Sequence, residues 1–339
     1  MDLIEFAQRM PKAELHVHLE GSILPRTLIK LARRNHISLP AEDEAGLKKT
    51  YQFKDFNQFL DTYMMITSCL RTVDDYRLVA YEYGGECARQ NIRYAEVTFT
   101  ILTNSRMTGL PWQDILGGLN TGREQAHQEF GVCWQWVFDI VRNLPETQAE
   151  VLEIALAARD MGVVALGLGG TEAGFPPELF ADTFRWAEKE HLHRVPHAGE
   201  ICGPKSVWSA IKLLHAERIG HGVRSIEDPT LVEYLRTMSL PLEVCPTSNV
   251  RLKVYPDYAQ HPLRKLWDAG LLLTIGSDDP PIFGTDLNQE YQSLVKYYHF
   301  SQAELEQLSL NGLQSGFLSQ GDKQRLVREF QDEFKRLST

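Results

Sequence analysis

The stretch Ala13-Glu-Leu-His-Val-His-Leu-Glu-Gly21 places two histidines, His16 and His18, at alternate positions of a short apolar run. Alternate residues of a β-strand share a face, so both imidazoles are expected to face one point in space. Two neutral imidazoles converging at a strand end are a common start to a zinc or iron site. Such a pair also arises by chance, so its meaning depends on what the later segments add.

Similar apolar or β-rich runs recur along the chain, separated by segments with helical periodicity. Eight strands are expected, at 15–19, 94–100, 134–141, 163–169, 194–197, 218–222, 242–246 and 271–276. The expected helices between them span 74–90, 111–130, 146–161, 177–191, 204–216, 228–238 and 261–269. Regular alternation predicts parallel strands with right-handed crossovers, and eight units favour a closed (β/α)8 barrel of the TIM type over an open sheet.

Two parts of the chain fall outside this repeat. Residues 40–72 include an aromatic-rich segment at 51–65 with helical spacing, placed after the first strand. A helical lid over the barrel mouth is expected there, although a helix that simply packs on the barrel gives the same pattern. Beyond residue 285, two or three amphipathic helices are expected to close the barrel. Nothing resembles a linker or a repeat, so residues 1–339 are interpreted as a single domain.

Composition sets broad limits on location and partners. The chain of 339 residues is 43% hydrophobic and 24% charged, as is typical of a globular protein. A net charge of −10 argues against nucleic acid or an anionic membrane surface as a partner. Five scattered cysteines without a CxxC motif fit a reducing compartment, and no apolar run approaches the ~20 residues of a membrane span. We therefore expect a cytoplasmic protein with a small-molecule partner.

The candidate polar groups all follow expected strands, at the end that carries the active site of a β/α barrel. His197 ends strand five, His221 ends strand six, and Asp278 and Asp279 follow strand eight. A lone histidine at such a position is usually a packed residue. Four of the eleven histidines on one rim, together with two aspartates, favour a functional site instead.

Histidine nitrogens and a carboxylate oxygen suit a catalytic zinc ion, which binds about four ligands, one of them water, and sometimes five in all. The expected protein ligands are His16, His18, His197 and Asp278. Bound zinc lowers the pKa of water from ~15.7 toward ~7 and so supplies hydroxide at neutral pH.

Three further side chains are expected around the metal. Glu200, three residues after His197, would lie beside the metal with a raised pKa and donate a proton. His221 would either accept the proton of the water or hold the hydroxide by hydrogen bond and charge. Asp279 points away from its neighbour Asp278 and is free to bind substrate.

The end of strand four bears on the number of metals. It reads Val163-Val-Ala-Leu-Gly-Leu-Gly-Gly-Thr-Glu172 and lacks the lysine that often bridges two metals, so a single metal is favoured. Glu172 leaves the two-metal alternative open. The glycines, Gly170 among them, let backbone touch a flat ligand, whereas no helix-opening lysine follows to make a phosphate loop.

In this order, four segments resemble the adenosine deaminase family of the amidohydrolase superfamily. They are Lys12-Ala-Glu-Leu-His-Val-His-Leu-Glu-Gly21, His197-Ala-Gly-Glu200, Arg218-Ile-Gly-His-Gly222 and Ser277-Asp-Asp-Pro280. The likeness spans roughly residues 10–290, including the lid-like insertion. The other class of zinc deaminases combines an H-x-E motif with P-C-x-x-C, and this sequence has no P-C-x-x-C motif, so it does not match that class.

The resemblance implies a role for each residue. His16, His18, His197 and Asp278 would bind one zinc ion. Glu200 would protonate purine N1 while His221 handles the water that attacks C6, and ammonia would leave. Asp279 would hydrogen-bond N7, and the backbone of Gly170 would meet N3. The purine itself comes from the resemblance alone.

One departure from the family bears on the substrate. Adenosine-specific members usually carry Asp-Gly after the second histidine, with the aspartate near the ribose, whereas this chain has Glu20-Gly21, as in relatives that act on adenine or other 6-aminopurines. The longer Glu20 would crowd the 5′ side of the ribose or move its hydrogen bond. The loop at 100–106 also differs, and Arg106 or Asn104 is placed to contact the far end of a substrate, although a solvated loop arginine fits equally well.

The expected function is zinc-dependent deamination of a 6-aminopurine nucleoside, with adenosine, converted to inosine and ammonia, as the default. Deamination of adenine, or of the menaquinone precursor aminodeoxyfutalosine, is the alternative within this chemistry. A non-catalytic purine-binding barrel is disfavoured, because Glu200 and His221 have no structural need to accompany a closed metal site. A hydrolase of another amide or ester would be indicated by a second bound metal.

Overall fold

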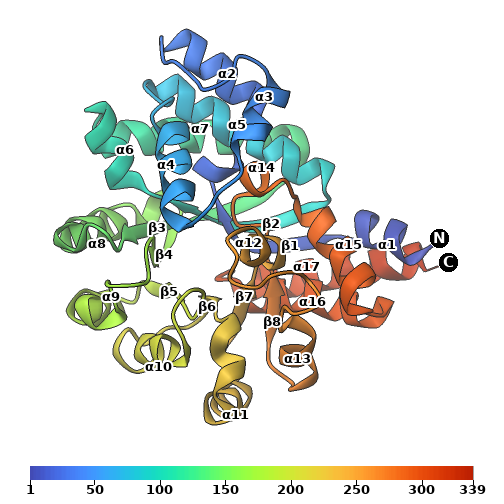
Figure 1. Cartoon of the computed structure of the whole chain (residues 1–339). Helices are drawn as coiled ribbons and strands as arrows, with labels where there is room; N and C mark the ends of the chain where they lie inside the picture. The colour runs from blue at the N-terminus through green and yellow to red at the C-terminus, as the bar shows by residue number, and fades with distance from the viewer. Residues whose placement is uncertain (339) are drawn as a thin grey trace.

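A computed structural model of the chain describes residues 1–338 (Figure 1). Eight parallel strands pair in chain order, from β1 to β8. They are β1 (Lys12–His18), β2 (Ile92–Phe99), β3 (Cys133–Val141), β4 (Val163–Gly169), β5 (His193–Ala198), β6 (Ile219–His221), β7 (Leu242–Val244) and β8 (Leu273–Ile275). Each of the eight expected strands is present, with ends shifted by a few residues, and the predicted TIM-type barrel is confirmed.

The barrel closes between β1 and β8 through one residue rather than a regular ladder. The backbone N–H of Asp278 donates to the carbonyl of His16 at 3.1 Å, and that of His18 donates to the carbonyl of Asp278 at 2.9 Å. Asp278 adopts a left-handed backbone conformation with φ of 62°. Closure of the barrel therefore brings together three side chains that the sequence assigns to the metal.

Helices cover the outside of the barrel, so the strands are buried on both faces. The barrel helices are α5 (Val73–Arg89), α7 (Trp112–Phe130), α8 (Gln148–Ala157), α9 (Ala181–Lys189), α10 (Pro204–Leu213), α11 (Pro229–Met238) and α13 (Leu263–Asp268). A Cβ at Gly122 of α7 would lie 2.1 Å from the carbonyl oxygen of Arg77, so glycine allows α5 and α7 to approach closely. Short helices follow three strands: α6 (Ile101–Thr108), α12 (Pro246–Arg251) and α14 (Pro280–Phe283).

The insertion after β1 forms α2 (Pro25–Arg34), α3 (Glu44–Thr50) and α4 (Phe56–Thr67). Figure 1 shows α4 beside the barrel mouth, with α2 and α3 further out. The ring of Phe59 on α4 stacks on Phe283 of α14 with centroids 5.2 Å apart, and Arg251 donates to the carbonyl of Tyr51. These contacts fix the insertion to the loops after β7 and β8.

The two chain ends lie side by side at the outer edge of the molecule (Figure 1), where α1 (Leu3–Arg9) packs against α15 (Leu287–Tyr298) and α16 (Gln302–Ser315); α17 (Gln320–Leu337) follows. The side chain of Phe317 packs against barrel residues Val137, Ala165 and Val195. The C-terminal helices, three in number, thus close the amino-terminal end of the barrel as expected. Within residues 1–338, no helix has both the length and the apolar character needed to span a membrane.

Candidate active site

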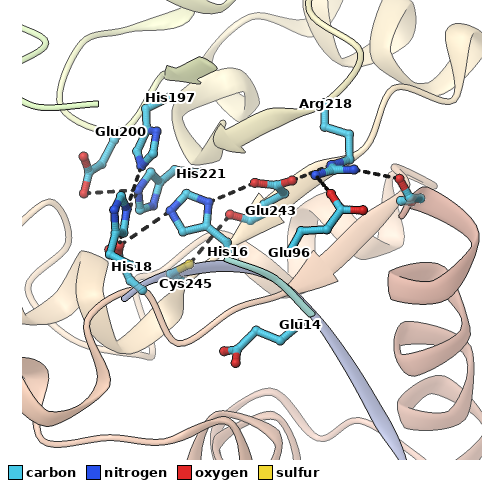
Figure 2. Close-up of polar contacts among 12 residues, drawn as sticks. Glu14, His16, His18, Glu96, His197, Glu200, Arg218, His221, Glu243 and Cys245 are labelled. Atoms are coloured by element: carbon cyan, nitrogen blue, oxygen red, sulfur yellow. Dashed lines mark hydrogen bonds and ion pairs between the residues drawn. The ribbon is translucent and has the colours of Figure 1, made fainter. Parts of the chain in front are cut away.

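The two histidines of β1 point to one place at the carboxyl end of the barrel (Figure 2). Nδ1 of His16 lies 2.9 Å from Oε2 of Glu243, so this nitrogen donates its proton and Nε2 keeps its lone pair. Nε2 is buried and has no hydrogen-bond partner within residues 1–338. A ring nitrogen left open in this way, with its tautomer fixed from the opposite side, is arranged as in a metal-binding histidine.

His197 and Asp278 complete the predicted ligand set. Nε2 of His197 lies 3.3 Å from Nε2 of His18, and Oδ1 of Asp278 lies 3.4 Å from Nε2 of His18 and 3.5 Å from Nε2 of His16. Four ligands placed about 2.1 Å from a tetrahedral zinc ion would be about 3.4 Å apart. The four side chains therefore fit a single ion by donor type, by spacing and by the open nitrogen of His16.

A second group of possible ligands overlaps the first and includes His221 and Cys245. Burial raises the pKa of the Cys245 thiol well above its usual range, and Sγ of Cys245 lies 3.8 Å from the carbonyl of Glu243. Cys245 is absent from the lining of the pocket that exposes His18, His197 and Asp278. The group with three histidines is therefore the one from which a metal can reach a substrate.

Glu243 joins His16 to a buried ion-pair network (Figure 2). Nε of Arg218 donates to Oε1 of Glu243 at 2.6 Å, and Nη2 of Arg218 donates to Oε2 of Glu96 at 2.5 Å. Glu96 also accepts the backbone N–H of Phe317 beneath the barrel. Each buried charge has a partner, so the orientation of His16 depends on contacts that run the length of the barrel interior.

Glu200 lies in the pocket where the sequence places a proton donor. It is 6% exposed, and Oε1 lies 3.7 Å from Nε2 of His221 and has no hydrogen-bond partner among the described residues. Burial raises the pKa of Glu200 well above its usual range, and the carboxylates of Asp278 and Glu172 raise it further. A carboxyl that stays protonated in this way can donate a proton to a substrate.

Glu172, at the end of β4, supports the loop that carries Glu200. Its two oxygens accept hydrogen bonds from three backbone N–H groups and one hydroxyl, those of Gly199, Ile201, Cys202 and Ser206. The metal-binding groups found within residues 1–338 both include His16 and Asp278, and neither includes Glu172. The geometry therefore gives the two-metal alternative no support.

A chain of hydrogen bonds fixes the tautomer of His221. The backbone N–H of Leu263 donates to Nδ1 of His261, so the proton of neutral His261 lies on Nε2, which donates to Oδ1 of Asn249 at 3.0 Å. The amide nitrogen of Asn249 then faces Nδ1 of His221 at 3.3 Å. Burial lowers the pKa of both histidines to about 3, so each ring is neutral at pH 7. Neutral His221 therefore carries its proton on Nε2, directed toward Glu200 and Asp278.

Asp279 and Gly170 both line the pocket. Oδ1 of Asp279 is buried without a hydrogen-bond partner in the described chain, and burial, with the charge of Asp278, raises the pKa of Asp279 well above its usual range. A Cβ at Gly21 would fall 1.7 Å from this oxygen, so a side chain there would displace Asp279. Gly170 has φ of 90°, which favours glycine and turns its backbone at the pocket edge.

Of the residues predicted to act in catalysis or to bind the substrate, Glu20 is the one that the structure sets back from the pocket. It is fully buried and is not part of the pocket lining. Oε1 of Glu20 accepts hydrogen bonds from the N–H and hydroxyl of Thr100, at 3.1 and 2.5 Å, and from the side chain of Asn104 at 2.8 Å. Glu20 thus holds the turn from β2 into α6, and Thr100 presents that turn to the pocket.

The pocket itself encloses about 130 Å³ over the metal-binding group. Helix α4 supplies one wall, so the insertion covers the site as a lid, with side chains Phe56, Phe59, Leu60, Tyr63 and Met64. Two residues of the site were not predicted. Asp139 of β3 lines the pocket, and its Oδ1 is buried without a partner within residues 1–338; its only signal in the sequence is a lone carboxylate near the end of a largely apolar strand. The hydroxyl of Ser248 donates to Asp278 at 2.6 Å.

The barrel and the residues at its carboxyl end define the class of the molecule as an amidohydrolase, in which barrel loops present the catalytic groups. The sequence matches the adenosine deaminase family over residues 11–333. The chain belongs to this family and is a hydrolytic deaminase that acts on cyclic amidines.

Relatives and solved structures agree with this assignment. The chain is 40% identical to an aminodeoxyfutalosine deaminase of Streptomyces avermitilis, over 97% of this chain and 92% of the relative. It is 38% identical to an adenine deaminase of Cupriavidus necator, over 96% and 93% of the two chains. The crystal structure of adenine deaminase from Arthrobacter aurescens superposes with a TM-score of 0.91 at 33% identity, covering 96% and 99%. An amidohydrolase from Burkholderia ambifaria with bound Zn gives 0.90 at 26% identity, covering all of this chain and 94% of the other.

These relatives confirm deaminase chemistry, and their names bear on which of the expected substrates is supported. The names of the relatives cite adenine and aminodeoxyfutalosine. Adenosine as the default substrate is therefore not supported, and the alternative within the same chemistry fits better.

Proposed function

We propose that this protein is a zinc-dependent deaminase of a 6-aminopurine, with aminodeoxyfutalosine as the first candidate substrate and free adenine as the second. The observation that carries the proposal is the convergence of three imidazole nitrogens and one carboxylate oxygen at the spacing of zinc ligands, beside the buried acid Glu200. Nitrogen and oxygen ligands of this kind suit zinc. The zinc-containing relative from Burkholderia ambifaria adds support.

Zinc held by His16, His18, His197 and Asp278 would lower the pKa of water toward ~7 and so provide the nucleophile. The protein side chains then have separate tasks. Glu200 donates its proton to purine N1 as water adds to C6, which draws electron density away from C6. His221 donates a hydrogen bond from Nε2 to the attacking oxygen. One proton of the water restores Glu200, and the other leaves with ammonia.

Two further groups orient the purine ring. Asp279, protonated because of its burial, donates to N7, and the backbone of Gly170 lies at the edge that receives N3. A ring held between these groups presents C6 to the metal and N1 to Glu200. These assignments follow the order of the residues around the pocket and the resemblance to the family.

The combined volume of the pocket and the chamber beside it favours the larger aminodeoxyfutalosine over adenine. The pocket of about 130 Å³ is smaller than the roughly 300–1,000 Å³ usual for ligand sites, and an adjoining chamber of about 260 Å³ brings the space into that range. The relative from Streptomyces avermitilis is consistent with this order. Adenine stays second because the chain also resembles adenine deaminases over nearly its whole length.

The test is ammonia release from adenine, adenosine and aminodeoxyfutalosine at equal concentration, on protein whose zinc content has been measured. We expect turnover of aminodeoxyfutalosine to have the highest kcat/KM, with adenosine well below it. A preference for adenine would establish the second candidate. Absence of ammonia from all three, with one zinc per chain, would contradict the proposal.

The assigned role of His221 has its own test, in Asn249→Asp. A carboxylate at this position accepts a proton from Nδ1 of His221, so Nε2 loses its proton and can no longer donate. We expect kcat to fall about 10- to 100-fold, the value of one hydrogen bond to a charged group, with zinc content unchanged. Ring ¹⁵N shifts of His221 report the tautomer directly, and an Nδ1–H form in the wild type would overturn the assignment.

A further inference from the structure

A separate cavity lies on the flank of the barrel, between the insertion, β1 and the loop after β8. This flank cavity encloses about 540 Å³ and shares no lining residue with the active-site pocket. Figure 1 shows α2, α3 and α5, which border it, on the opposite side of the barrel from α10 and α11. Its volume falls within the roughly 300–1,000 Å³ usual for ligand sites. The flank cavity therefore has the size of a ligand site, at a place that the deaminase reaction does not use.

The inner wall of the flank cavity is polar and buried. Glu14 of β1 and Tyr83 of α5 both line it and are 2% and 6% exposed. Apart from the thiol of Cys87, which is a weak partner, the hydroxyl of Tyr83 has no hydrogen-bond partner within residues 1–338. A buried hydroxyl left in this way is rare, and a ligand hydroxyl would satisfy it. The inner wall thus suits a ligand that carries hydroxyl groups.

Glu14 connects this inner wall to the loop after β8. Its Oε1 accepts hydrogen bonds from the N–H and the hydroxyl of Ser277, at 3.0 and 2.6 Å. The lining continues along this loop to Ile282 of α14. Another part of the wall belongs to the insertion, where Lys48 and Tyr51 line the cavity. A ligand in the flank cavity therefore contacts both the barrel and the insertion.

The mouth of the flank cavity carries more cationic than acidic side chains, although the whole chain has a net charge of −10. Its exposed and half-buried charged residues are Arg26, Lys48, Arg89, Arg251, Glu44, Glu86 and Asp286. Two of the arginines pair with two of the acids. Lys48 and Arg251 form no ion pair with any described residue, and Arg251 donates one hydrogen bond to the carbonyl of Tyr51. These two unpaired cations, on α3 and α12, favour an anionic group at the mouth.

We propose that the flank cavity binds a small phosphate ester with free hydroxyl groups, a sugar phosphate or a nucleotide. The phosphate lies at the mouth and pairs with Lys48 and Arg251, and the hydroxyl groups reach Tyr83 and Glu14. Phosphate suits the mouth better than a carboxylate does, because its larger charge and three oxygens engage two cations at once. The bound ester contacts the insertion and the barrel together, so it stabilises the docked position of the insertion. The inference does not rest on the proposed function.

Equilibrium titration of the full-length protein tests the site with ribose 5-phosphate and uridine 5′-monophosphate, neither of which carries a 6-aminopurine. Ribose and inorganic phosphate each offer half of the recognised chemistry. We expect at least one ester to bind saturably with a Kd below about 1 mM, and both halves to bind about tenfold more weakly or less. The tighter ester identifies the ligand class as sugar phosphate or nucleotide. Failure of both esters to bind would overturn the inference.

Lys48→Gln tests the phosphate contact at the mouth. It should raise the Kd of the ester about tenfold, the size of one hydrogen bond to a charged group. Lys49→Gln is the matched control, because Lys49 is the next residue on the same helix and does not line the flank cavity. It should leave the Kd unchanged. An ester that binds equally well to both variants and to the wild type would contradict the proposed site.

Tyr83→Phe tests the contact at the inner wall, since it removes the unpartnered hydroxyl and nothing else. The Kd of the ester should rise about three- to tenfold, and that of inorganic phosphate should not change. Tyr298→Phe removes another buried hydroxyl without a partner in the described chain, and Tyr298 does not line the cavity. Equal losses of ester binding in the two variants would mean that the hydroxyl of Tyr83 makes no contact with the ligand.

Backbone amide exchange locates the bound ester independently of any substitution. Saturation with the ester should slow exchange in α3 and at Tyr51, because the ligand holds this part of the insertion against the barrel. Exchange in α10 and α11, on the far side of the barrel, serves as the internal reference. Saturable binding without slower exchange in α3 would place the ester elsewhere and overturn the inference.

Discussion

The two sides of the barrel mouth differ in how firmly their side chains are held. On the metal side, His16, Glu243 and Arg218 are buried, and each contacts the next. On the chamber side, Met64, Leu144 and Arg106 are half exposed, and Arg106 has only a surface partner. The reaction is therefore built into a rigid network, while the contacts to the rest of the substrate can change at little cost in stability. This agrees with relatives that share deamination but differ in the substrate they are named for.

The largest effect is expected at the metal side, from Asp278→Ala. This change removes one proposed zinc ligand and also the side chain that His16 and His18 face. We expect zinc content well below one per chain and ammonia release at background, measured by metal analysis and a steady-state assay. Recovery of activity with excess zinc would fit a weakened site. Stoichiometric zinc in the purified variant would remove Asp278 from the ligand set.

Glu200→Gln should keep zinc and lose turnover. Proton transfer contributes about 10²–10⁴-fold, so kcat should fall by that factor while zinc remains at one per chain. In the proposed mechanism Glu200 acts in its protonated form, and its pKa is raised, so wild-type kcat should fall as pH rises through that pKa. The residual activity of the variant should lack this alkaline decline. Glu217→Gln is the matched control. The carboxylate of Glu217 lies 3.1 Å from Nη2 of Arg194 and does not line the pocket.

Glu243→Gln tests whether the buried network serves the metal as well as the fold. It weakens the acceptor that orients His16, and zinc affinity should fall about 10- to 100-fold in competition with a chelator. Glu96→Gln alters the same network on the other side of Arg218 and does not touch His16. It should lower the melting temperature to a similar degree with zinc affinity nearly unchanged. Equal losses of affinity in both variants would mean that the network acts only through stability.

The smallest effect is expected on the chamber side, from Glu20→Asp. The shorter carboxylate loses contact with Thr100 and Asn104, so the turn between β2 and α6 is free to move. The ratio of kcat/KM for adenosine to that for aminodeoxyfutalosine should rise about three- to tenfold, within the range of one hydrogen bond, with zinc unchanged. Glu20→Gln keeps the length and should leave the ratio close to that of the wild type. A large loss of activity against both nucleosides would instead place Glu20 at the chemistry.

Most of the metal side could be predicted because its residues are marked locally. His16 and His18 share a strand face, and Asp278 follows a strand that the apolar pattern already predicts. The partners of these residues carry no such mark. Glu243 is separated from His16 by 227 positions, and Asn249 lies in a short helix that the periodicity did not predict. Asp139 was missed because its importance rests on an empty hydrogen-bond position, which a sequence does not display.

The sequence by itself determined the eightfold alternation of strands and helices, the presence of a helical insertion after the first strand, and the four side chains that converge at the strand ends. These follow from periodicity and from the rule that parallel strands of a barrel direct their carboxyl ends to one rim. The tertiary structure alone decided which nitrogen of His16 and of His221 faces the site, that Glu20 lies behind Thr100, and that a chamber opens beside the pocket. Each of these depends on distances between segments far apart in the chain, and folding sets such distances through packing.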